Sequence, residues 1–322
     1  MSSQPLGAGG NSRVFRVELD DASPSRRVIV KFYRRDPGDA RDRLGTEFGG
    51  LRFLWQNGVR SIPRPLAVVG DRQCAIYECL DGEVAASEPA RPADIDAAID
   101  FLSVLKQLRC APGSDALAPA SEACFSLGDV VASIEGRLHR LRGADGGDAE
   151  TMRTWIDGTL GPLADRVNHW CRGAANAAGI DFDQPIGAGA RTLSPSDFGF
   201  HNAIRRPDGT LAFIDFEYFG WDDPAKTIVD FLLHPGMLLD DTMKRRFAAG
   251  VCAAFPELAA LPARTRMAYP LFALKWAVIL LNDFLPERAG QATSAHRAAQ
   301  LAKAQALVRR AAREYLDNPF LP

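Results

Sequence analysis

Three residues with oxygen-bearing side chains lie close together in the chain. Asp197 precedes Asn202 by five residues, and Asp215 follows Asn202 by thirteen. Between them, NAIRR and LAFID are β-prone runs separated by Pro-Asp-Gly at 207–209, which predicts a β-hairpin. Because a hairpin brings its two ends together, we expect Asn202 and Asp215 to lie side by side, with Asp197 on the adjoining loop. Oxygen ligands in this arrangement suit a hard cation such as Mg²⁺ and a hydroxyl nucleophile.

Each of the three residues also has a simpler explanation. Asp197 and Asn202 can satisfy the backbone of a turn, and Asp215 can end a strand. Their combined spacing around one Pro-Asp-Gly turn favours the functional interpretation. The letters D-F-G at 197–199 match the magnesium-binding triplet of protein kinases, so the sequence raises the question of which aspartate would hold a metal.

The surrounding sequence predicts two parts of different character. Short β-prone runs dominate the first part, at 12–19, 26–33, 64–70 and 73–80, with one helical pattern at 41–59. Only six residues precede Gly7, barely enough for a strand. Beyond a connection at 81–94, helical patterns span 94–108, 127–141, 149–171 and most of the chain from Pro224, with the β-prone segment 191–220 between them. We therefore expect an α+β fold with a small β-rich N-terminal lobe at residues 1–82 and a larger, mostly helical C-terminal lobe at residues 83–322.

Composition excludes several classes of partner. A formal net charge of −2 provides no basic field for nucleic acid. The six cysteines show no zinc spacing, which predicts reduced thiols in a cytoplasmic protein. The N-terminus has no secretory pattern, and the apolar segment 269–285 is interrupted by Lys275 and Asp283. We expect that segment to be a buried helix and expect no membrane partner.

The segments SDFGFHN at 196–202 and FIDFEYFGWDDPAK at 213–226 resemble the catalytic core of aminoglycoside phosphotransferases and choline kinases, which have a protein-kinase-like fold. IDFEY is closer to choline and ethanolamine kinases, and GWDDPAK to the antibiotic phosphotransferases. The resemblance implies that Asp197 is the catalytic base, Asn202 a second-metal ligand and Asp215 the principal Mg²⁺ ligand. The D-F-G letters at 197–199 are then a coincidence.

A kinase-like N-terminal lobe needs a glycine-rich turn over the phosphates. LGAGGNSRVFRV provides Gly7, Gly9 and Gly10, with Ser12 where a third glycine would stand. Glycines let backbone N–H groups approach phosphate oxygens closely. Glycine-rich turns are also common between strands, so this motif alone is not specific.

The same lobe needs a strand lysine and a helix glutamate that holds it. Lys31 is the only lysine before Lys106, and its neighbours in VIVKFY are apolar. An unpaired ammonium there would be costly, so we expect Glu47 on the following helix to be its partner. The simpler alternatives are a solvated strand lysine and an exposed helix acid. CAIYECLDGE resembles the segment whose backbone binds adenine, which implies a role for Glu78 and Leu80 there.

The sequence departs from the family pattern in three places. Pro195 stands where the family has a histidine, two residues before the catalytic aspartate. That histidine braces the catalytic loop, so its replacement puts the support of the loop in doubt. Ser12 in place of the third glycine weakens the expected phosphate cover. His201, next to Asn202, is either an acid/base or a structural residue.

The segment EYFGWDDP after Asp215 borders the expected acceptor pocket. We expect acceptor contacts from Glu217, Tyr218, Trp221 and Asp222. Aromatics with acids suit an amine or quaternary ammonium group, and they equally suit sugar stacking or core packing. One of the acids at 222–223 is expected to cap the helix that follows.

We therefore expect an ATP-dependent, Mg²⁺-requiring phosphotransferase, with GTP as an alternative nucleotide. It would move the γ-phosphate to a hydroxyl of a small molecule: a sugar, an aminoglycoside-like compound or an amino alcohol such as choline. A protein kinase is disfavoured because the segment from Asp215 to Pro224 leaves no room for a long activation loop. A catalytically impaired kinase-like module that binds nucleotide or a partner is the other alternative. The sequence leaves the acceptor and the oligomeric state open.

Overall fold

The computed structural model describes residues 2–8, 11–20, 27–35, 39–234, 236–237, 239–288, 292–318 and 320–321. The chain forms two compact units. Unit 1 comprises Met1–Ala123, Thr192–Asp222 and His234–Leu239, and unit 2 comprises Cys124–Arg191, Asp223–Leu233 and Asp240–Pro322. The lobe boundary expected after residue 82 falls inside unit 1, and that division stays a prediction.

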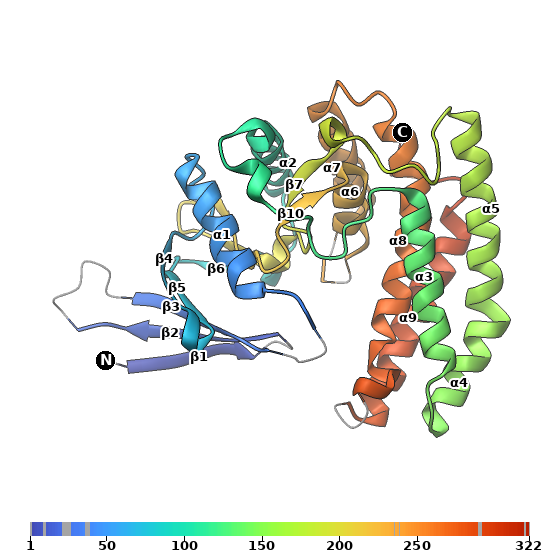
Figure 1. The fold of residues 1–322 in the computed structure, drawn as a ribbon, viewed down its shortest axis with the longest axis horizontal. Helices are drawn as coiled ribbons and strands as arrows, with labels where there is room; N and C mark the ends of the chain where they lie inside the picture. Colours follow the sequence, from blue (N-terminus) through green and yellow to red (C-terminus); the bar gives the residue numbers. More distant parts are fainter. Residues whose placement is uncertain are drawn as a thin grey trace. The chain divides into compact units, whose positions relative to one another are not determined.

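An antiparallel sheet of five strands forms the N-terminal part of unit 1 (Figure 1). Its strands are β1 Ser2–Ala8, β2 Ser12–Glu18, β3 Arg27–Tyr33, β4 Pro65–Val69 and β5 Cys74–Glu78, in the order β1-β2-β3-β5-β4. The runs expected at 12–19, 26–33, 64–70 and 73–80 are confirmed as β2, β3, β4 and β5. Strand β1 was not expected from the sequence. The few residues before Gly7 form a strand because they pair with β2.

Helix α1, Arg43–Gln56, carries Glu47 and contacts β4 and β5. Asp42 caps it by accepting a hydrogen bond from the N–H of Gly45 at 2.9 Å, which satisfies an otherwise unpaired donor of the first turn. Leu51 and Leu54 are fully buried. Because the buried face of α1 includes Glu47, the helix directs a carboxylate into the interior.

The hairpin expected from the Pro-Asp-Gly turn is confirmed. Strands β8 Ala203–Arg205 and β9 Leu211–Phe213 pair with Ala203 opposite Phe213. The turn closes through a hydrogen bond from the N–H of Arg206 to the Thr210 carbonyl at 2.8 Å, and Gly209 supplies the positive φ of 85° that the turn needs. The short strand β6 Glu83–Val84 extends this sheet beside β8.

The segment that contains the hairpin is closed at both ends. Strand β7 Thr192–Ser194 before it pairs antiparallel with β10 Gly220–Asp222 after it. Gly220 has no substitute here, because a Cβ would lie 2.3 Å from the Ala118 carbonyl oxygen. The intervening residues are therefore held as one closed unit.

Helix α2, Pro92–Gln107, anchors this segment in unit 1. Phe101 packs against Phe213 and Phe198, with ring centroids 4.5 and 5.8 Å apart. Asp94 forms a bidentate ion pair with Arg205 of β8, with N–O distances of 2.5 and 3.0 Å. Burial raises the pKa of Asp94, but the Arg205 guanidinium outweighs it and holds that pKa below its usual range.

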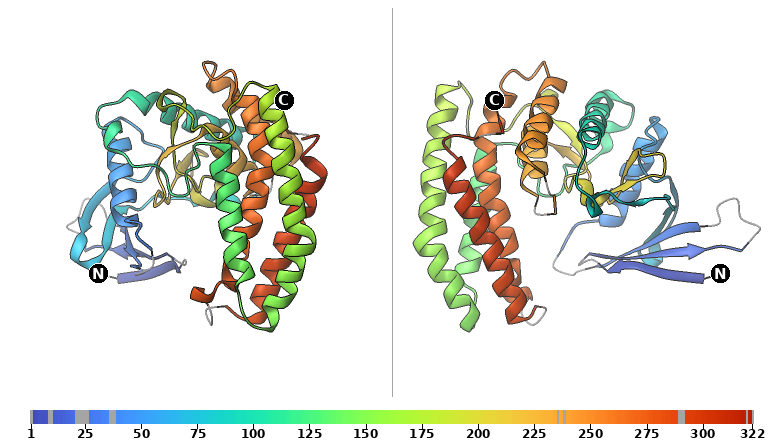
Figure 2. Two further views of the ribbon diagram at one scale, coloured as in Figure 1. Left: turned by 45° about the vertical axis from the view of Figure 1, so that its right-hand side comes forward. Right: turned by 180° about the vertical axis from the view of Figure 1, so that it is seen from behind.

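Unit 2 is helical. Its helices are α3 Leu127–Arg142, α4 Gly147–Trp155, α5 Gly161–Ala177, α6 Pro224–Leu233, α7 Asp241–Ala254, α8 Leu261–Leu280 and α9 Ser294–Glu314, and a π-helical turn at Ile156–Leu160 joins α4 to α5. Helices α3, α5, α6 and α9 all contact α8, and Figure 2 shows α3, α5, α8 and α9 side by side. The helices expected in this region are thereby confirmed.

Short 3₁₀ helices complete both units. In unit 1 they are Gly70–Arg72, Ala85–Ser87, Leu108–Cys110, Ser114–Ala116 and Phe200–Asn202. In unit 2 they are Ala188–Ala190, Asn282–Phe284 and Pro286–Arg288.

The apolar segment at 269–285 belongs to the core of unit 2. By length and hydropathy alone, Leu261–Phe284 could cross a membrane, yet 72% of its most apolar window is buried inside the structure. The expectation of a buried helix is confirmed. Asp223 accepts a hydrogen bond from the N–H of Ala225 at 2.8 Å, at the start of α6, so Asp223 is the acid that caps this helix.

The Asp94–Arg205 ion pair generates a stability prediction. Asp94→Ala leaves the Arg205 guanidinium only the longer contact with Glu88 at 3.9 Å. Breaking a fully buried pair costs about 3–5 kcal/mol, and Arg205 keeps some exposure, so a loss of about 2–3 kcal/mol is expected. We expect the free energy of unfolding, measured by urea titration, to fall by that amount. Asp100→Ala, an exposed change on the same helix, is the matched control and should stay within about 0.5 kcal/mol of the wild type. Equal stability of the two variants would contradict the anchoring role.

Candidate active site

Lys31 is the centre of a buried cluster of charges in unit 1. Its Nζ lies 2.7 Å from Glu47 Oε2, 2.6 Å from Asp215 Oδ1 and 3.5 Å from Glu217 Oε2. Only 5% of Lys31 is exposed. The Lys31–Glu47 pair expected from the sequence is present, and two further carboxylates share the same ammonium.

The surroundings of Lys31 keep it charged. Burial by itself would lower the pKa of Lys31, but the carboxylates of Glu47, Asp215 and Glu217 outweigh burial and raise that pKa well above its ordinary value. Lys31 is therefore an ammonium at neutral pH. Burial raises the pKa of Glu47, against the opposing effect of Lys31. Arg43 Nε lies 3.9 Å from Glu217 Oε1, so three carboxyl groups share two cations in this cluster.

Glu47 is fixed by hydrogen bonds from three elements. Besides Lys31 of β3, it accepts from the Tyr33 hydroxyl at 2.7 Å and from the backbone N–H of Phe216 at 3.2 Å. Tyr33 in turn contacts the Tyr77 hydroxyl at 2.7 Å. The glutamate of α1 thereby connects the sheet to the segment that follows Asp215.

Asp215 adopts an unusual backbone conformation. Its φ is 65°, in the left-handed region that costs most residues energy and that aspartate tolerates better than most. Ser196, directly before Asp197, has a φ of 67°. Strained residues of this kind cluster at functional sites, and here both occur beside candidate catalytic aspartates.

Glu217 and Tyr218 are held by a residue that follows the glycine-rich turn. The amide Nδ2 of Asn11 lies 2.8 Å from Glu217 Oε1 and 2.5 Å from the Tyr218 hydroxyl. Glu217 is 5% exposed, and its Oε2 accepts no hydrogen bond from the described residues. Glu217, which was expected in the acceptor pocket, thus lies against Lys31 and Asn11.

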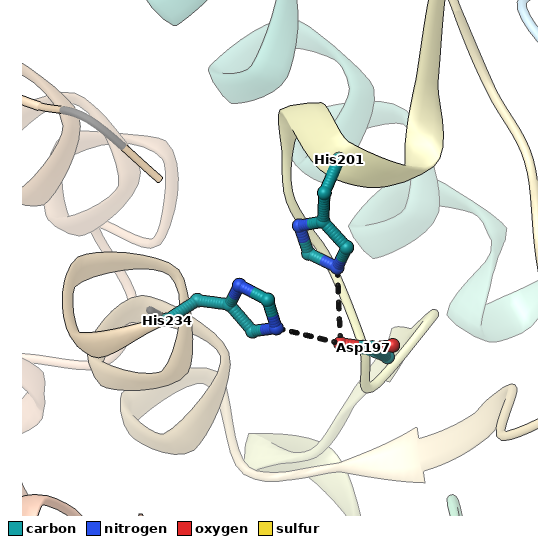
Figure 3. Close-up of side chains that lie close together, drawn as sticks. All are labelled: Asp197, His201 and His234. Carbon is teal, nitrogen blue, oxygen red and sulfur yellow. Dashed lines mark hydrogen bonds and ion pairs between the residues drawn. The ribbon is translucent and has the colours of Figure 1, made fainter. Parts of the chain in front are cut away.

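Asp197 lies at the centre of a second cluster. Its Oδ1 is 3.2 Å from His201 Nε2 and 3.4 Å from His234 Nε2, and its Oδ2 is 3.2 Å from Asn202 Nδ2. Figure 3 shows both imidazoles pointing toward the carboxylate. Burial raises the pKa of Asp197, but the contacts with His201 and His234 outweigh it and hold the pKa below its usual range. Asp197 is therefore ionised.

The two clusters are connected through the hairpin. The N–H of Ile214 donates to the Asn202 carbonyl at 2.9 Å, which places Asp215 next to the residue pair 197 and 202. The sequence predicted from the hairpin that Asn202 and Asp215 would lie side by side. The Asn202 amide also donates to the Asp197 carbonyl at 3.0 Å, and both of these hydrogen bonds use Nδ2.

The structure describes four of the other expected nucleotide-binding residues. Gly7 is in β1 and Ser12 in β2, whereas Gly9 and Gly10 lie outside the described residues. Glu78 ends β5 and accepts from the N–H of Arg64 at 3.0 Å. Half-buried Leu80 follows β5.

Trp221 and Asp222 lie in β10. The indole N–H of Trp221 donates to the Ser114 carbonyl at 3.2 Å, and Asp222 is fully buried. Their expected acceptor contacts stay a prediction.

Sequence reasoning missed two residues of this site. Asn11 stands beside the glycine-rich turn, and that position was its only signal. His234 carries no signal in the sequence, since it lies 37 residues after Asp197 and follows a helix. Only the folded chain brings it to the aspartate.

Comparisons with known proteins agree with this geometry. The model of the phosphotransferase enzyme family matches residues 2–267. No curated protein sequence matches the chain. Among solved structures, spectinomycin phosphotransferase in complex with ADP and spectinomycin has a TM-score of 0.67 at 9% identity, over 97% of this chain and 93% of that chain. Choline kinase from Cryptosporidium parvum has a TM-score of 0.64 at 10% identity, over 100% and 91%.

A third similar structure is an ADP-bound aminoglycoside phosphotransferase. Its TM-score is 0.61 at 17% identity, over 96% of this chain and 92% of that chain. Likeness at these identities shows the fold, and it confirms the α+β, kinase-like fold expected from the sequence. The family model spans most of the chain and confirms the resemblance drawn from its motifs. The chain belongs to the phosphotransferase enzyme family.

Proposed function

We propose that the protein transfers the γ-phosphate of ATP to a hydroxyl group of a small molecule. The observation that carries this proposal is the convergence, within unit 1, of a buried ammonium held by Glu47 and Asp215 with an ionised Asp197 beside Asn202. These are the residue types that phosphoryl transfer uses for positioning and for neutralising charge.

Lys31 is the proposed phosphate-binding cation. It is charged and held from one side by Glu47, so little side-chain freedom is lost when a phosphate oxygen accepts one of its hydrogens. Glu47 has the role of holding Lys31 in place. The glycine-rich turn with Gly7, Gly9, Gly10 and Ser12 would cover the phosphates, and the segment with Glu78 and Leu80 would border the adenine.

Asn202 and Asp215 fit a magnesium site by their chemistry. The Asp215 side chain is 38% exposed and uses Oδ1 toward Lys31. In its hydrogen bonds to the described residues, the Asn202 side chain uses Nδ2. Asp215 Oδ2 and Asn202 Oδ1 are therefore oxygens of the kind that Mg²⁺ prefers. Carboxyl oxygens of Glu47, Asp215 and Glu217 also lie within 4.8 Å of one another, which suits a divalent cation. Such a cation, when bound, neutralises charge on the phosphate oxygens.

Asp197 is the proposed partner of the acceptor hydroxyl. An ionised carboxylate accepts a hydrogen bond from the hydroxyl and orients its oxygen toward the γ-phosphorus. As the new P–O bond forms and the bond to the leaving nucleoside diphosphate breaks, the hydroxyl proton passes to Asp197. A low pKa makes Asp197 a weak base, so its main contribution is orientation, in keeping with the loose transition state of phosphoryl transfer.

The acceptor is proposed as a class only. The similar structures include spectinomycin phosphotransferase, in complex with spectinomycin, and choline kinase. By analogy, the proposed acceptor is an aminoglycoside-like compound or an amino alcohol. Tyr218, Trp221, Glu217 and Asp222 stay the candidate acceptor residues. Of these, Tyr218 and Trp221 are half-buried, which leaves part of each side chain open to a ligand.

Nucleotide binding is tested by thermal denaturation. At about 100 times its Kd, a ligand that binds only the folded protein adds about 2.7 kcal/mol. At roughly 2–4 °C per kcal/mol, Mg·ATP should raise Tm by several degrees, and Mg·GTP as a parallel sample decides the nucleotide. If no nucleoside triphosphate shifts Tm, with or without Mg²⁺, the proposal is wrong.

Lys31→Met removes the ammonium while keeping much of the side-chain volume. We expect a higher KM for ATP and a lower kcat, measured as phosphate release from Mg·ATP with water as the acceptor, because the phosphates lose their cation. Glu47→Gln should show a milder form of the same defect. Lys303→Met, an exposed change on α9, is the control. Wild-type kinetics in Lys31→Met would show that this lysine has no part in catalysis.

The roles of the two aspartates are separable. Asp197→Asn keeps the shape of the side chain but loses the charge that orients the hydroxyl and accepts its proton. Turnover should therefore fall by about 10²–10⁴-fold while Mg·ATP binding stays near normal. Asp215→Asn should weaken Mg·ATP binding together with turnover. Calorimetric titration of both variants with Mg·ATP measures this. The inverse pattern would mean that the letters D-F-G at 197–199 form a metal-binding triplet after all.

A further inference from the structure

The catalytic loop lacks the histidine that its family places two residues before the catalytic aspartate, where this chain has Pro195. The structure nevertheless surrounds Asp197 with imidazoles. His201 reaches it from the 3₁₀ helix Phe200–Asn202, and His234 reaches it from the segment His234–Leu239 of unit 1. Figure 3 shows the two rings approaching the same carboxylate oxygen.

The hydrogen bonding of His234 determines which of its nitrogens carries the proton. The backbone N–H of Gly236 donates to His234 Nδ1 at 3.1 Å, so Nδ1 is an acceptor. A neutral imidazole has one acceptor and one donor nitrogen. Nε2 therefore carries the proton, and it points at Asp197 Oδ1 from 3.4 Å. This distance is slightly longer than the usual ~2.7–3.2 Å of such a hydrogen bond.

The ring of His234 is also held in orientation. It stacks on His201, with centroids 3.8 Å apart and an angle of 2° between the planes. Two imidazoles thus approach Asp197 Oδ1, while Asn202 donates to Oδ2 at 3.2 Å. A carboxylate with contacts on both oxygens has little freedom to rotate.

The same three side chains have the donor set of a transition-metal site, because two imidazoles and a carboxylate lie within 4.8 Å of one another. The Gly236 contact argues against that use. To bind a metal, His234 would need a lone pair on Nε2. In the tautomer set by Gly236, Nε2 carries the proton instead. The two imidazoles and the Asn202 amide therefore form a hydrogen-bond clamp, which means that they hold the Asp197 carboxylate in one orientation.

We propose that His234 is a positioning residue that clamps Asp197 in place of the histidine missing at position 195. This inference rests on the proposed role of Asp197. His234 does not touch the substrate in this account, since it acts through the aspartate. Its loss should therefore lower kcat and leave the KM for ATP near the wild-type value.

Two substitutions separate the N–H donor from the ring. His234→Phe keeps a stacking ring and loses the donor, and His234→Gln keeps an N–H donor and loses the ring. Misplacing a reacting group by about 1 Å costs up to about 10²-fold in rate, so we expect kcat for phosphate release from Mg·ATP to fall by about 10–100-fold in His234→Phe. His234→Gln should recover most of that loss. His139→Phe, an exposed change on α3, is the matched control.

A merely structural role for His234 predicts a different result. Both variants would then lose activity in proportion to a lower Tm, and the glutamine would give no rescue. Equal kcat in His234→Phe and the wild type, or a defect confined to the KM for ATP, would also overturn the inference.

The tautomer gives a test that needs no activity. Two-bond ¹H–¹⁵N correlation spectra distinguish the imidazole tautomers, and His234→Phe identifies the signals of His234. We expect the Nε2–H form in the wild type. The Nδ1–H form would overturn the clamp even if the enzyme is active. An inactive wild type with the Nε2–H form would instead count against the proposed function, while the hydrogen-bond geometry stands.

Discussion

A single buried ammonium organises the candidate site. Lys31 is 5% exposed and lies within 3.5 Å of three carboxylates, and an ammonium in such a place would be very costly without them. The carboxylates come from α1 and from the segment after β9, so neutralising Lys31 requires the sheet, the helix and the hairpin to meet at one point. The cluster therefore fixes Glu47 and Asp215 relative to each other before any ligand is present.

The second organising constraint is the backbone of the closed segment between β7 and β10. Pairing of these strands fixes its ends, and Phe198 anchors its middle against Phe101 and Phe213. With ends and middle fixed, the strained φ angles of Ser196 and Asp215 are imposed by the surroundings. Asp197 and Asp215 are thus presented by a rigid scaffold, which suits a reaction that depends mainly on positioning.

Local patterns made part of this site predictable from the sequence. The hairpin follows from the Pro-Asp-Gly turn, and the Lys31–Glu47 pair from one lysine among apolar neighbours. The contacts of Asn11 with Glu217 and of His234 with Asp197 were not predictable, because they join residues far apart in the chain and depend on how the elements pack. Pro195 likewise suggested that the loop before Asp197 had lost its supporting histidine. In the structure, His201 and His234 contact Asp197 from other positions in the chain.

The charge state of Lys31 tests the central claim most directly. The chain has only six lysines, so the ammonium signals in ¹H–¹⁵N spectra are few, and Lys31→Met identifies the one from Lys31. In the folded protein, the account predicts that Lys31 stays protonated above pH ~10.4, the ordinary lysine pKa, and that its hydrogens exchange slowly with water because the carboxylates hold them. A Lys31 signal that titrates at or below that pH would contradict the charge cluster on which the site depends.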